Sequence, residues 1–317
     1  MKTIQELSLK LKKEKSVAIF CHIRPDGDTL GSALALFHAL NNLGIKAKVF
    51  CDDTVPSRFF FLKSASLVEN TFSGEYSAML AIDCADISRL GSFYDEFSKH
   101  KNTYSIDHHV SNTRYAKENL VIDNASNCEN ILALIESLGV QIDEEIANLL
   151  AMGIMTDTGN FRHKNVTPNT LSSASKLVEK GADLNTIYFH MFSKQSKARA
   201  KLFGQAMSKI RYFLDDRLAV ASVFEKDIIS SGARPDETEG FIDFIMGIDT
   251  VEVGACILEI GKDKYKISFR SKGTNVNEVA STFGGGGHML ASGCQIQGEY
   301  EEVVDKIYRA VKRHIRD

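Results

Sequence analysis

The sequence predicts an α/β protein with a parallel-sheet N-terminal domain and a smaller α+β C-terminal domain. The length of 317 residues suits two domains of ordinary size. In the first half, short apolar runs typical of buried strands alternate with longer segments whose apolar residues recur at helical spacing. In the second half, two strand-like runs are joined by a Gly-Lys-Asp turn, which is typical of a hairpin.

The N-terminal elements are predicted in alternating order. Strands are expected over residues 16–22, 46–50, 78–83 and 103–107, and helices over residues 29–43, 131–139 and 144–155. Gly44 favours the end of the first of these helices. Because strands that alternate with helices form parallel sheets, we expect ligands beyond the carboxyl ends of the strands.

A charged segment of helical pattern over residues 193–210 is predicted to be a connector helix between domains at 1–192 and 211–317. In the second domain, strands are expected over residues 211–224, 251–260, 264–271 and 294–297, and helices over residues 275–283 and 299–315. A run of four glycines, Gly284–Gly287, precedes the last of these strands.

Charge and cysteine content exclude several classes of protein. The net charge of −3 gives no global basic field, so we expect no binding of long duplex nucleic acid. The six cysteines form no CxxC pair and fit no zinc framework, which favours a reducing cytoplasm. The first residues are charged and amphipathic, unlike a secretory signal, and no apolar run approaches the ~20 residues that cross a membrane.

Polar side chains gather where the predicted core elements end. Residues 22–28 read HIRPDGD, which places His22, Asp26 and Asp28 in a turn after the first strand. Two aspartates two positions apart can point at different places, as required by a pair of metals ~3.5–4 Å apart. Taken alone, the segment is equally typical of an acidic turn with a helix N-cap.

Three further segments follow the same rule. Asp83 closes the run AMLAID, Asp107, His108 and His109 close TYSIDHH, and Asp157 follows the helix that ends in GIMT. Each alone is also typical of an ordinary loop residue, but all four segments are expected at one edge of the sheet. Imidazole combined with carboxylates suits Mn²⁺, Fe²⁺, Co²⁺ or Zn²⁺ better than Mg²⁺. The sequence therefore predicts a metal site.

These segments match the motifs of a known family. HIRPDGDTLGS, AIDCAD, IDHHVSN and GIMTDTGNF resemble the four motifs of DHH phosphoesterases, and FGGGGHMLASG resembles the signature of the DHH-associated C-terminal domain. The order and length most resemble the NrnA-type subgroup, which hydrolyses nanoRNA and removes the 3′-phosphate from 3′-phosphoadenosine 5′-phosphate (pAp). The resemblance implies a Rossmann-like N-terminal domain and an active-site cleft between the two domains.

The resemblance also implies roles for the polar residues. His22, Asp26 and Asp83 would hold one metal, and Asp28, Asp83, His108 and Asp157 the other, so that Asp83 bridges them. Mn²⁺ is the expected metal, with Mg²⁺, Co²⁺ or Fe²⁺ as alternatives. His109 would face the scissile phosphate, and Asp107 would support His108. Metals that lower the pKa of a water toward ~7 would generate a hydroxide that attacks phosphorus.

The second domain is expected to bind the substrate. Glycine-rich backbone can gather N–H groups around an anion, and an arginine can fork onto a phosphate. A flexible turn and a solvated strand end are the ordinary alternatives, and the resemblance favours the binding role. The residues assigned to the substrate are His109, Arg270, Ser271, Gly284, Gly285, Gly286, Gly287 and His288. After the histidine of FGGGGHMLASG, where relatives often have Lys, Asn and Ala, this sequence has Met289, Leu290 and Ala291. Arg162 and His163 are weaker candidates.

The expected substrates are short oligoribonucleotides or pAp. A cyclic di-AMP or linear dinucleotide (pApA or pGpG) phosphodiesterase is the alternative of the same kind. A RecJ-like exonuclease would carry extra nucleic-acid-binding domains, and pyrophosphatase relatives lack the GGGGH ending. A non-catalytic nucleotide- or RNA-binding module should have lost at least one predicted ligand, and none is lost. The oligomeric state is left open, with a homodimer among the expectations.

Overall fold

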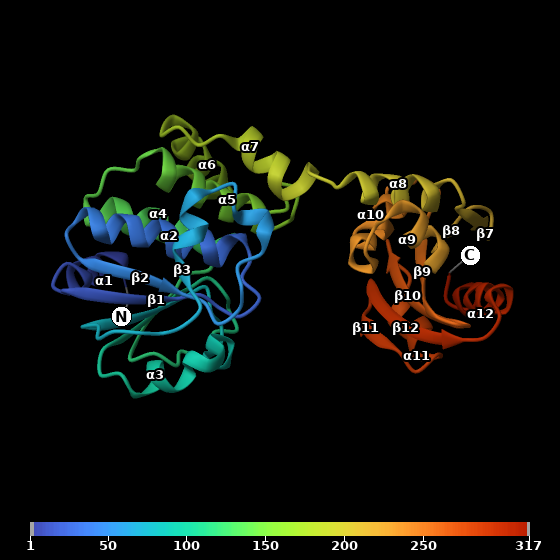
Figure 1. Ribbon diagram of the computed structural model, residues 1–317, viewed down its shortest axis with the longest axis horizontal. Coiled ribbons are helices and arrows are strands. Elements are labelled where there is room, and N and C mark those ends of the chain that lie inside the picture. Colours follow the sequence, from blue (N-terminus) through green and yellow to red (C-terminus); the bar gives the residue numbers. More distant parts are fainter. Residues whose placement is uncertain (1–2, 316–317) are drawn as a thin grey trace. The chain divides into compact units, whose positions relative to one another are not determined.

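The computed structural model describes residues 3–315, and the chain divides into two units between Lys194 and Gln195 (Figure 1). The first unit is built on a six-stranded sheet in which every strand pair is parallel. Its strands are β1 (Ser16–Phe20), β2 (Lys46–Phe50), β3 (Val68–Glu69), β4 (Ala78–Ile82), β5 (Thr103–Asp107) and β6 (Glu118–Val121). The predicted α/β class is confirmed.

The strand order is β3-β2-β1-β4-β5-β6, the order of doubly wound nucleotide-binding folds. The chain runs outward from β1 to β3, then returns to the other side of β1 with β4. The ends of β1 and β4 are therefore the point where the order reverses, and ligands bind there in such sheets.

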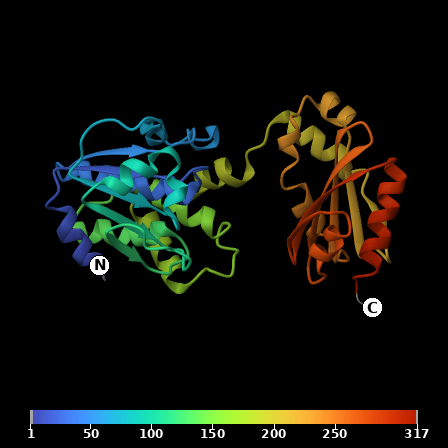
Figure 2. The ribbon, with the colours of Figure 1, turned by 90° about the horizontal axis from the view of Figure 1, so that it is seen from below.

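Helices cover both faces of this sheet (Figures 1 and 2). One face packs against α1 (Ile4–Leu11), α2 (Gly27–Asn42), α4 (Asn127–Leu138) and α5 (Glu144–Asp157), which share a large apolar core with it. The other face carries an aromatic cluster around Phe20 and Phe50, closed by η3 (Ile87–Phe93) and α3 (Tyr94–Lys99). The remaining helical elements of the unit are η1 (Ser57–Phe59), η2 (Lys63–Leu67), α6 (Pro168–Glu179), α7 (Leu184–Tyr188) and the π-helical η4 (Phe189–Ser193).

The second unit is a mixed six-stranded sheet in the order β11-β12-β10-β9-β8-β7. Its strands are β7 (Arg211–Phe213), β8 (Leu218–Val223), β9 (Val253–Gly261), β10 (Lys264–Ser271), β11 (Gly286–His288) and β12 (Ala291–Gln297). Only the pair β8–β9 is parallel, and the predicted hairpin is the antiparallel pair β9–β10.

Helices lie on both faces of this second sheet as well. One face shares an apolar core with α11 (Val276–Ser281) and α12 (Tyr300–Lys312). On the other face, α8 (Lys197–Met207) and α10 (Phe241–Met246) pack over β8 and β9. The short elements α9 (Glu225–Ser231) and η5 (Pro235–Thr238) complete the unit. The segment predicted as a connector thus forms α8, whose Leu202 and Ala206 are buried in this unit.

Several element boundaries differ from the prediction. Asp157 is the last residue of α5 and does not follow the helix. The predicted strand 211–224 is interrupted at Leu214–Asp216, where three consecutive residues have positive φ. Strand β6 was not predicted, because its four residues Glu118–Val121 show only one buried side chain. Part of the glycine run forms β11, because it pairs with β12.

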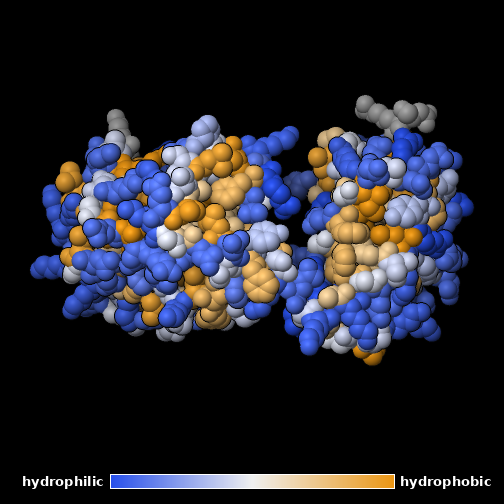
Figure 3. Space-filling view, turned by 90° about the horizontal axis from the view of Figure 1, so that it is seen from above, coloured by the Kyte–Doolittle hydropathy of each residue, from blue (hydrophilic) through white to orange (hydrophobic). Residues whose placement is uncertain are grey.

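Exposed apolar side chains occur on the first unit beside α7. Phe60, Tyr188 and Phe189 are each about half exposed, and apolar residues stand among charged ones on the face seen in Figure 3. Exposed apolar patches often mark contact surfaces, so a homodimer would have this surface available. Within residues 3–315, no helix has the length and apolarity that crossing a lipid bilayer requires.

Candidate metal centre and substrate face

The predicted ligands lie at the carboxyl ends of β1, β4 and β5. His22 comes two residues after β1, Asp83 directly follows β4, and His108 directly follows β5. Asp83 has a φ of 55°, a left-handed conformation that is rare for a residue with a Cβ and costs about 1–3 kcal/mol. Such strain is typical of functional sites, where the surrounding structure enforces it.

The two carboxylate oxygens of Asp26 make different contacts. Its Oδ1 atom accepts hydrogen bonds from the backbone N–H groups of Asp28 (3.0 Å) and Thr29 (3.1 Å), so it caps α2. Its Oδ2 atom lies 3.5 Å from Nε2 of His22. The N-cap role and the ligand role therefore use different oxygens of one carboxylate.

Asp83 stands between two histidines. Its Oδ2 atom lies 3.7 Å from Nε2 of His22, and its Oδ1 atom lies 3.4 Å from Nε2 of His108. The same Nε2 of His108 lies 3.4 Å from Oδ2 of Asp157 and 3.8 Å from Oδ2 of Asp28. The donor atoms form three overlapping groups that could each hold a metal ion. These groups are His22, Asp26 and Asp83; Asp83, His108 and His109; and Asp28, His108 and Asp157.

Burial and charge in this cluster favour a cation. Asp28, Asp83 and His22 are all buried. Burial raises the pKa of Asp157 to about 7, and the charge of Asp83 adds to the effect. Burial, with the charges of Asp83 and Asp157, also raises the pKa of Asp28 well above its usual range. Burial alone would lower the pKa of His22, but hydrogen bonds to Asp26 and Asp83 raise it to about 9.

Two buried atoms at the centre have no hydrogen-bond partner in the described part of the chain, Oδ1 of Asp83 and Nε2 of His108. Unpaired buried polar atoms are costly, and these two face one another across 3.4 Å. Divalent cations bound by nitrogen and oxygen would satisfy both atoms and neutralise the carboxylates. The residues present therefore fit a metal centre without sulfur ligands.

Asp107 supports a different histidine from the one that the resemblance implied. Its Oδ1 atom accepts from Nδ1 of His109 (2.8 Å) and from the backbone N–H of His108 (2.8 Å), and Asn112 donates to Oδ2 (2.6 Å). The ring of His108 instead pairs through Nδ1 with the carbonyl oxygen of Asn124 (3.0 Å). The hydrogen bond to Asp107 raises the pKa of His109.

The weaker candidates lie close to the metal ligands. Nε of Arg162 donates to the carbonyl of Gly159 (3.0 Å), and Nδ1 of His163 is 3.3 Å from the carbonyl oxygen of Asp157. Arg89, which the sequence analysis missed, places a guanidinium nitrogen 2.8 Å from Nδ1 of His22. The sequence could have indicated Arg89, because this residue follows the AIDCAD motif by three positions.

Arg270 lies on the face of the second sheet that also carries α8 and α10. Alternation along β10 buries Ile267 and Phe269 against α11 and α12 and turns Lys266, Ser268 and Arg270 to the opposite face. A hollow of about 360 Å³ is lined by these three residues and by the segment from Pro235 to Ile242. Lys266 and Ser268 were missed, although their spacing from Arg270 in KYKISFRS is that of one strand face.

The start of the glycine run lines a neighbouring hollow. This second hollow, of about 460 Å³, is lined by Gly284, Gly285 and Gly293 and again by Lys266 and Ser268. The two hollows are therefore adjacent on one face. Ser271 lines neither of them, and its hydroxyl accepts from the backbone N–H of Gly273 (2.9 Å).

The glycines also have structural roles. The N–H groups of Gly284 and Gly285 donate to carbonyls of α11, at Ser281 (3.1 Å) and Ala280 (3.0 Å), so they are not free to surround an anion. A Cβ at Gly285 would lie 2.2 Å from the carbonyl oxygen of Gly293. The exposed His288 ends β11, opposite Ala291.

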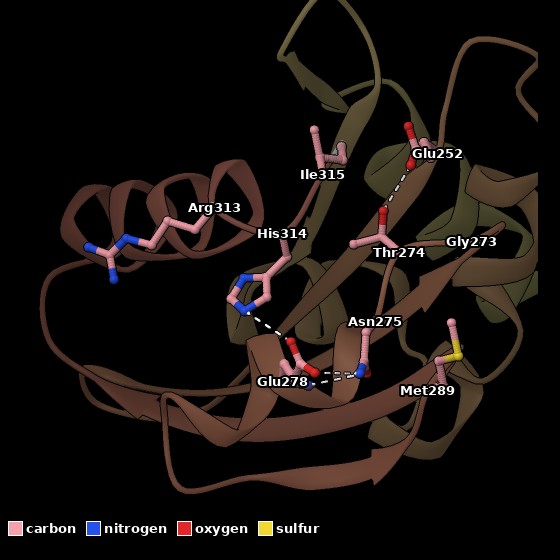
Figure 4. A pocket seen from close by; sticks show the side chains of 9 residues that line it. All are labelled: Glu252, Gly273, Thr274, Asn275, Glu278, Met289, Arg313, His314 and Ile315. Carbon is pink, nitrogen blue, oxygen red and sulfur yellow. Dashed lines mark hydrogen bonds and ion pairs between the residues drawn. The ribbon is translucent and has the colours of Figure 1, made fainter. Parts of the chain in front are cut away.

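A larger cavity in the second unit, of about 700 Å³, holds none of the predicted site residues (Figure 4). Its polar groups pair with one another. The hydroxyl of Thr274 donates to Glu252 (2.8 Å), Asn275 donates to Glu278 (2.8 Å), and Nε2 of His314 lies 3.6 Å from Glu278. These five polar side chains pair with one another, and we assign the cavity no role.

Comparison with known proteins agrees with this geometry. Residues 16–154 match the DHH family, N-terminal domain, and residues 215–317 match the DHHA1 domain. The chain belongs to the DHH phosphoesterase family.

Similar proteins cover the whole length of the chain. The bifunctional oligoribonuclease and PAP phosphatase NrnA of Thermus thermophilus is 32% identical over 95% of this chain and 91% of its own. The protein of the same name from Bacillus subtilis is 25% identical over 99% of this chain and 100% of its own. An exopolyphosphatase-related protein from Bacteroides fragilis superposes with a TM-score of 0.78 and 24% identity, covering 98% and 95% of the two chains. That structure supports the fold.

Proposed function

We propose that this protein is a metal-dependent phosphohydrolase of short oligoribonucleotides and pAp, and that Mn²⁺ is its metal. The observation that carries the proposal is Asp83, whose two carboxylate oxygens each face a different histidine inside a buried acidic cluster. The names of the relatives, bifunctional oligoribonuclease and PAP phosphatase, support the substrate class. A reducing cytoplasm is the proposed location.

The proposed metal ligands come from the candidate groups described above. His22, Asp26 and Asp83 would hold one cation, and Asp28, Asp83, His108 and Asp157 the other. Bound cations would supply a water of lowered pKa as nucleophile and positive charge beside the phosphoryl oxygens. Asp83 would belong to both sets of ligands, because its two oxygens face different histidines.

His109 is proposed to contact the substrate phosphate. Its side chain is 44% exposed, unlike that of His108, and it is held by Asp107, which is fully buried. A carboxylate in this position fixes the ring orientation and favours the protonated imidazole. The charged ring can donate a hydrogen bond to a phosphoryl oxygen, where negative charge accumulates during the reaction.

The face of the second sheet that carries Arg270 is proposed to bind the rest of the substrate. Arg270 can fork onto a phosphate, with Lys266 and Ser268 beside it and the glycine run and His288 at the edge. With a net charge of −3, the protein lacks the basic surface that long nucleic acid requires. The proposed substrates are accordingly short.

A substrate panel tests the function. With Mn²⁺ present, we expect release of product from pAp and from RNA of about five nucleotides, and much slower release from RNA of about 50 nucleotides. Panel members pGpG and cyclic di-AMP address the alternative phosphodiesterase activity. Comparable cleavage of the 5-mer and the 50-mer would contradict the proposal, and binding of the panel without any turnover would favour a non-catalytic binding module.

Arg270→Lys tests the substrate face separately. We expect KM for pAp to rise about 10-fold with little change in kcat, since a lysine keeps the charge but loses the two-pronged hydrogen bond. Lys272→Ala is the matched control, because this exposed lysine directly follows the same strand and lines neither hollow. An unchanged KM in the Arg270 variant would remove this residue from the site.

A further inference from the structure

Residues 122–128 comprise the loop after β6 and the first turn of α4, and none of them belongs to a candidate metal-binding group. This segment nevertheless contacts two of the predicted metal ligands directly. The carbonyl oxygen of Asn124 lies 3.0 Å from Nδ1 of His108. The backbone N–H groups of Asn127 and Cys128 donate to the two carboxylate oxygens of Asp28, at 2.6 and 2.9 Å. We call residues 122–128 the brace loop.

A third predicted ligand is tied to the brace loop through Asn165. The side-chain amide of Asn165 donates to the carbonyl oxygens of Ala125 (3.1 Å) and Asp157 (3.2 Å). The brace loop is thus linked to Asp28, His108 and Asp157, which together form one of the candidate metal-binding groups. Among the hydrogen bonds of residues 3–315, none links the loop to the group of His22, Asp26 and Asp83.

The brace loop is itself held by one buried side chain. Asn130 is 1% exposed and lies on α4, where the neighbouring Asn127 is also buried. Its Oδ1 atom accepts from Nδ2 of Asn124 (2.7 Å), and its Nδ2 atom lies 3.2 Å from the carbonyl oxygen of Ile122 and 3.3 Å from Oδ1 of Asn127. A buried amide is costly unless it is satisfied, and here most of its partners belong to the loop.

We propose that Asn130 is a positioning residue for one metal only, the one that Asp28, His108 and Asp157 would hold. It acts through the brace loop: by fixing Asn124, it fixes the carbonyl that receives the Nδ1–H of His108. That hydrogen bond orients the ring and leaves Nε2 free to bind a metal. The inference rests on the metal centre proposed above, and it predicts that the two metals can be weakened separately.

Metal titration tests this without any activity measurement. Metal-free protein is titrated with Mn²⁺, and free Mn²⁺ is followed by electron paramagnetic resonance. Wild-type protein should bind two ions. In Asn130→Leu, which keeps a similar volume but removes the amide, one ion should bind as before and the other about 10- to 100-fold more weakly, as for other residues that hold a metal ligand in place.

Two further variants make the test specific. Asn165→Ala, at an exposed position, should weaken the same ion, whereas Asn41→Ala should change nothing, although the exposed Asn41 amide also donates to a backbone carbonyl. In a His108→Ala background, where the affected site is already impaired, Asn130→Leu should have little additional effect, because the two residues act on one site.

The outcomes separate the two proposals. If wild-type protein binds no Mn²⁺, the proposed metal centre itself is wrong and the inference fails with it. If wild-type protein binds two ions and Asn130→Leu binds both equally well, or binds both more weakly to the same degree, the positioning role alone is overturned. Should Asn130→Leu not fold, the soluble Asn165→Ala variant decides, and unchanged binding of both ions in it contradicts the inference.

Discussion

Asp83→Ala is expected to lower kcat/KM for pAp by on the order of 1000-fold or more, because it removes the carboxylate that we propose is shared by both metals. Metal assistance contributes several kcal/mol to such reactions, and each 1.36 kcal/mol corresponds to a factor of ten in rate. The measurement is Mn²⁺-dependent phosphate release from pAp at saturating metal. Raising the Mn²⁺ concentration should not restore the activity of this variant, because both proposed metals lose a shared ligand.

The matched control is Asp95→Ala, which removes an exposed carboxylate that pairs only with Lys99 on α3. It should leave activity unchanged. Asp83→Ala should also fold normally without metal, because it removes one of several crowded carboxylates. A folded Asp83→Ala protein that retains more than about a tenth of wild-type activity would contradict the site assignment.

Mn²⁺ is expected to stabilise the first unit strongly against heat. At a free metal concentration of about 100 times Kd, binding to the native state alone adds about 2.7 kcal/mol. For a domain of about 150–250 residues, that corresponds to a rise in Tm of roughly 5–10 °C. The physical cause is the relief of repulsion among Asp28, Asp83 and Asp157, whose charges meet in a buried space.

Calorimetry with and without a chelator measures this shift. The unfolding transition of the second unit, whose core is separate, should not move with metal. Asp83→Ala serves as the control, since its transition should respond much less to Mn²⁺. If the first unit unfolds at the same temperature in chelator and in excess Mn²⁺, the cluster does not bind this metal.

Much of the fold could be predicted because its signals are local. The spans 46–50, 103–107 and 264–271 match β2, β5 and β10 residue for residue, since alternating or fully apolar runs bounded by polar residues define buried strands. The convergence of His22, Asp83 and His108 could be predicted because parallel strands end at one edge of the sheet.

What could not be predicted depends on contacts between distant segments. The preference of Asp107 for His109 over the ring of His108 is decided by the carbonyl of Asn124, which competes for the second histidine. The packing of α8 into the second unit depends on the apolar face formed by Val223 and Phe241. Lys266 and Ser268 can be recognised as candidate substrate contacts only when the structure shows that they line a hollow together with the glycine run.

The close packing of the glycine run against β12 changes how mutations there must be interpreted. A side chain at Gly285 or Gly287 would collide with β12 backbone atoms, so loss of activity in such variants would report damage to the sheet edge. Gly286 has an ordinary φ, and its nearest neighbour would be Oδ1 of Asn277 at 3.7 Å. An alanine at 286 is therefore the informative probe of whether nucleotides approach this edge.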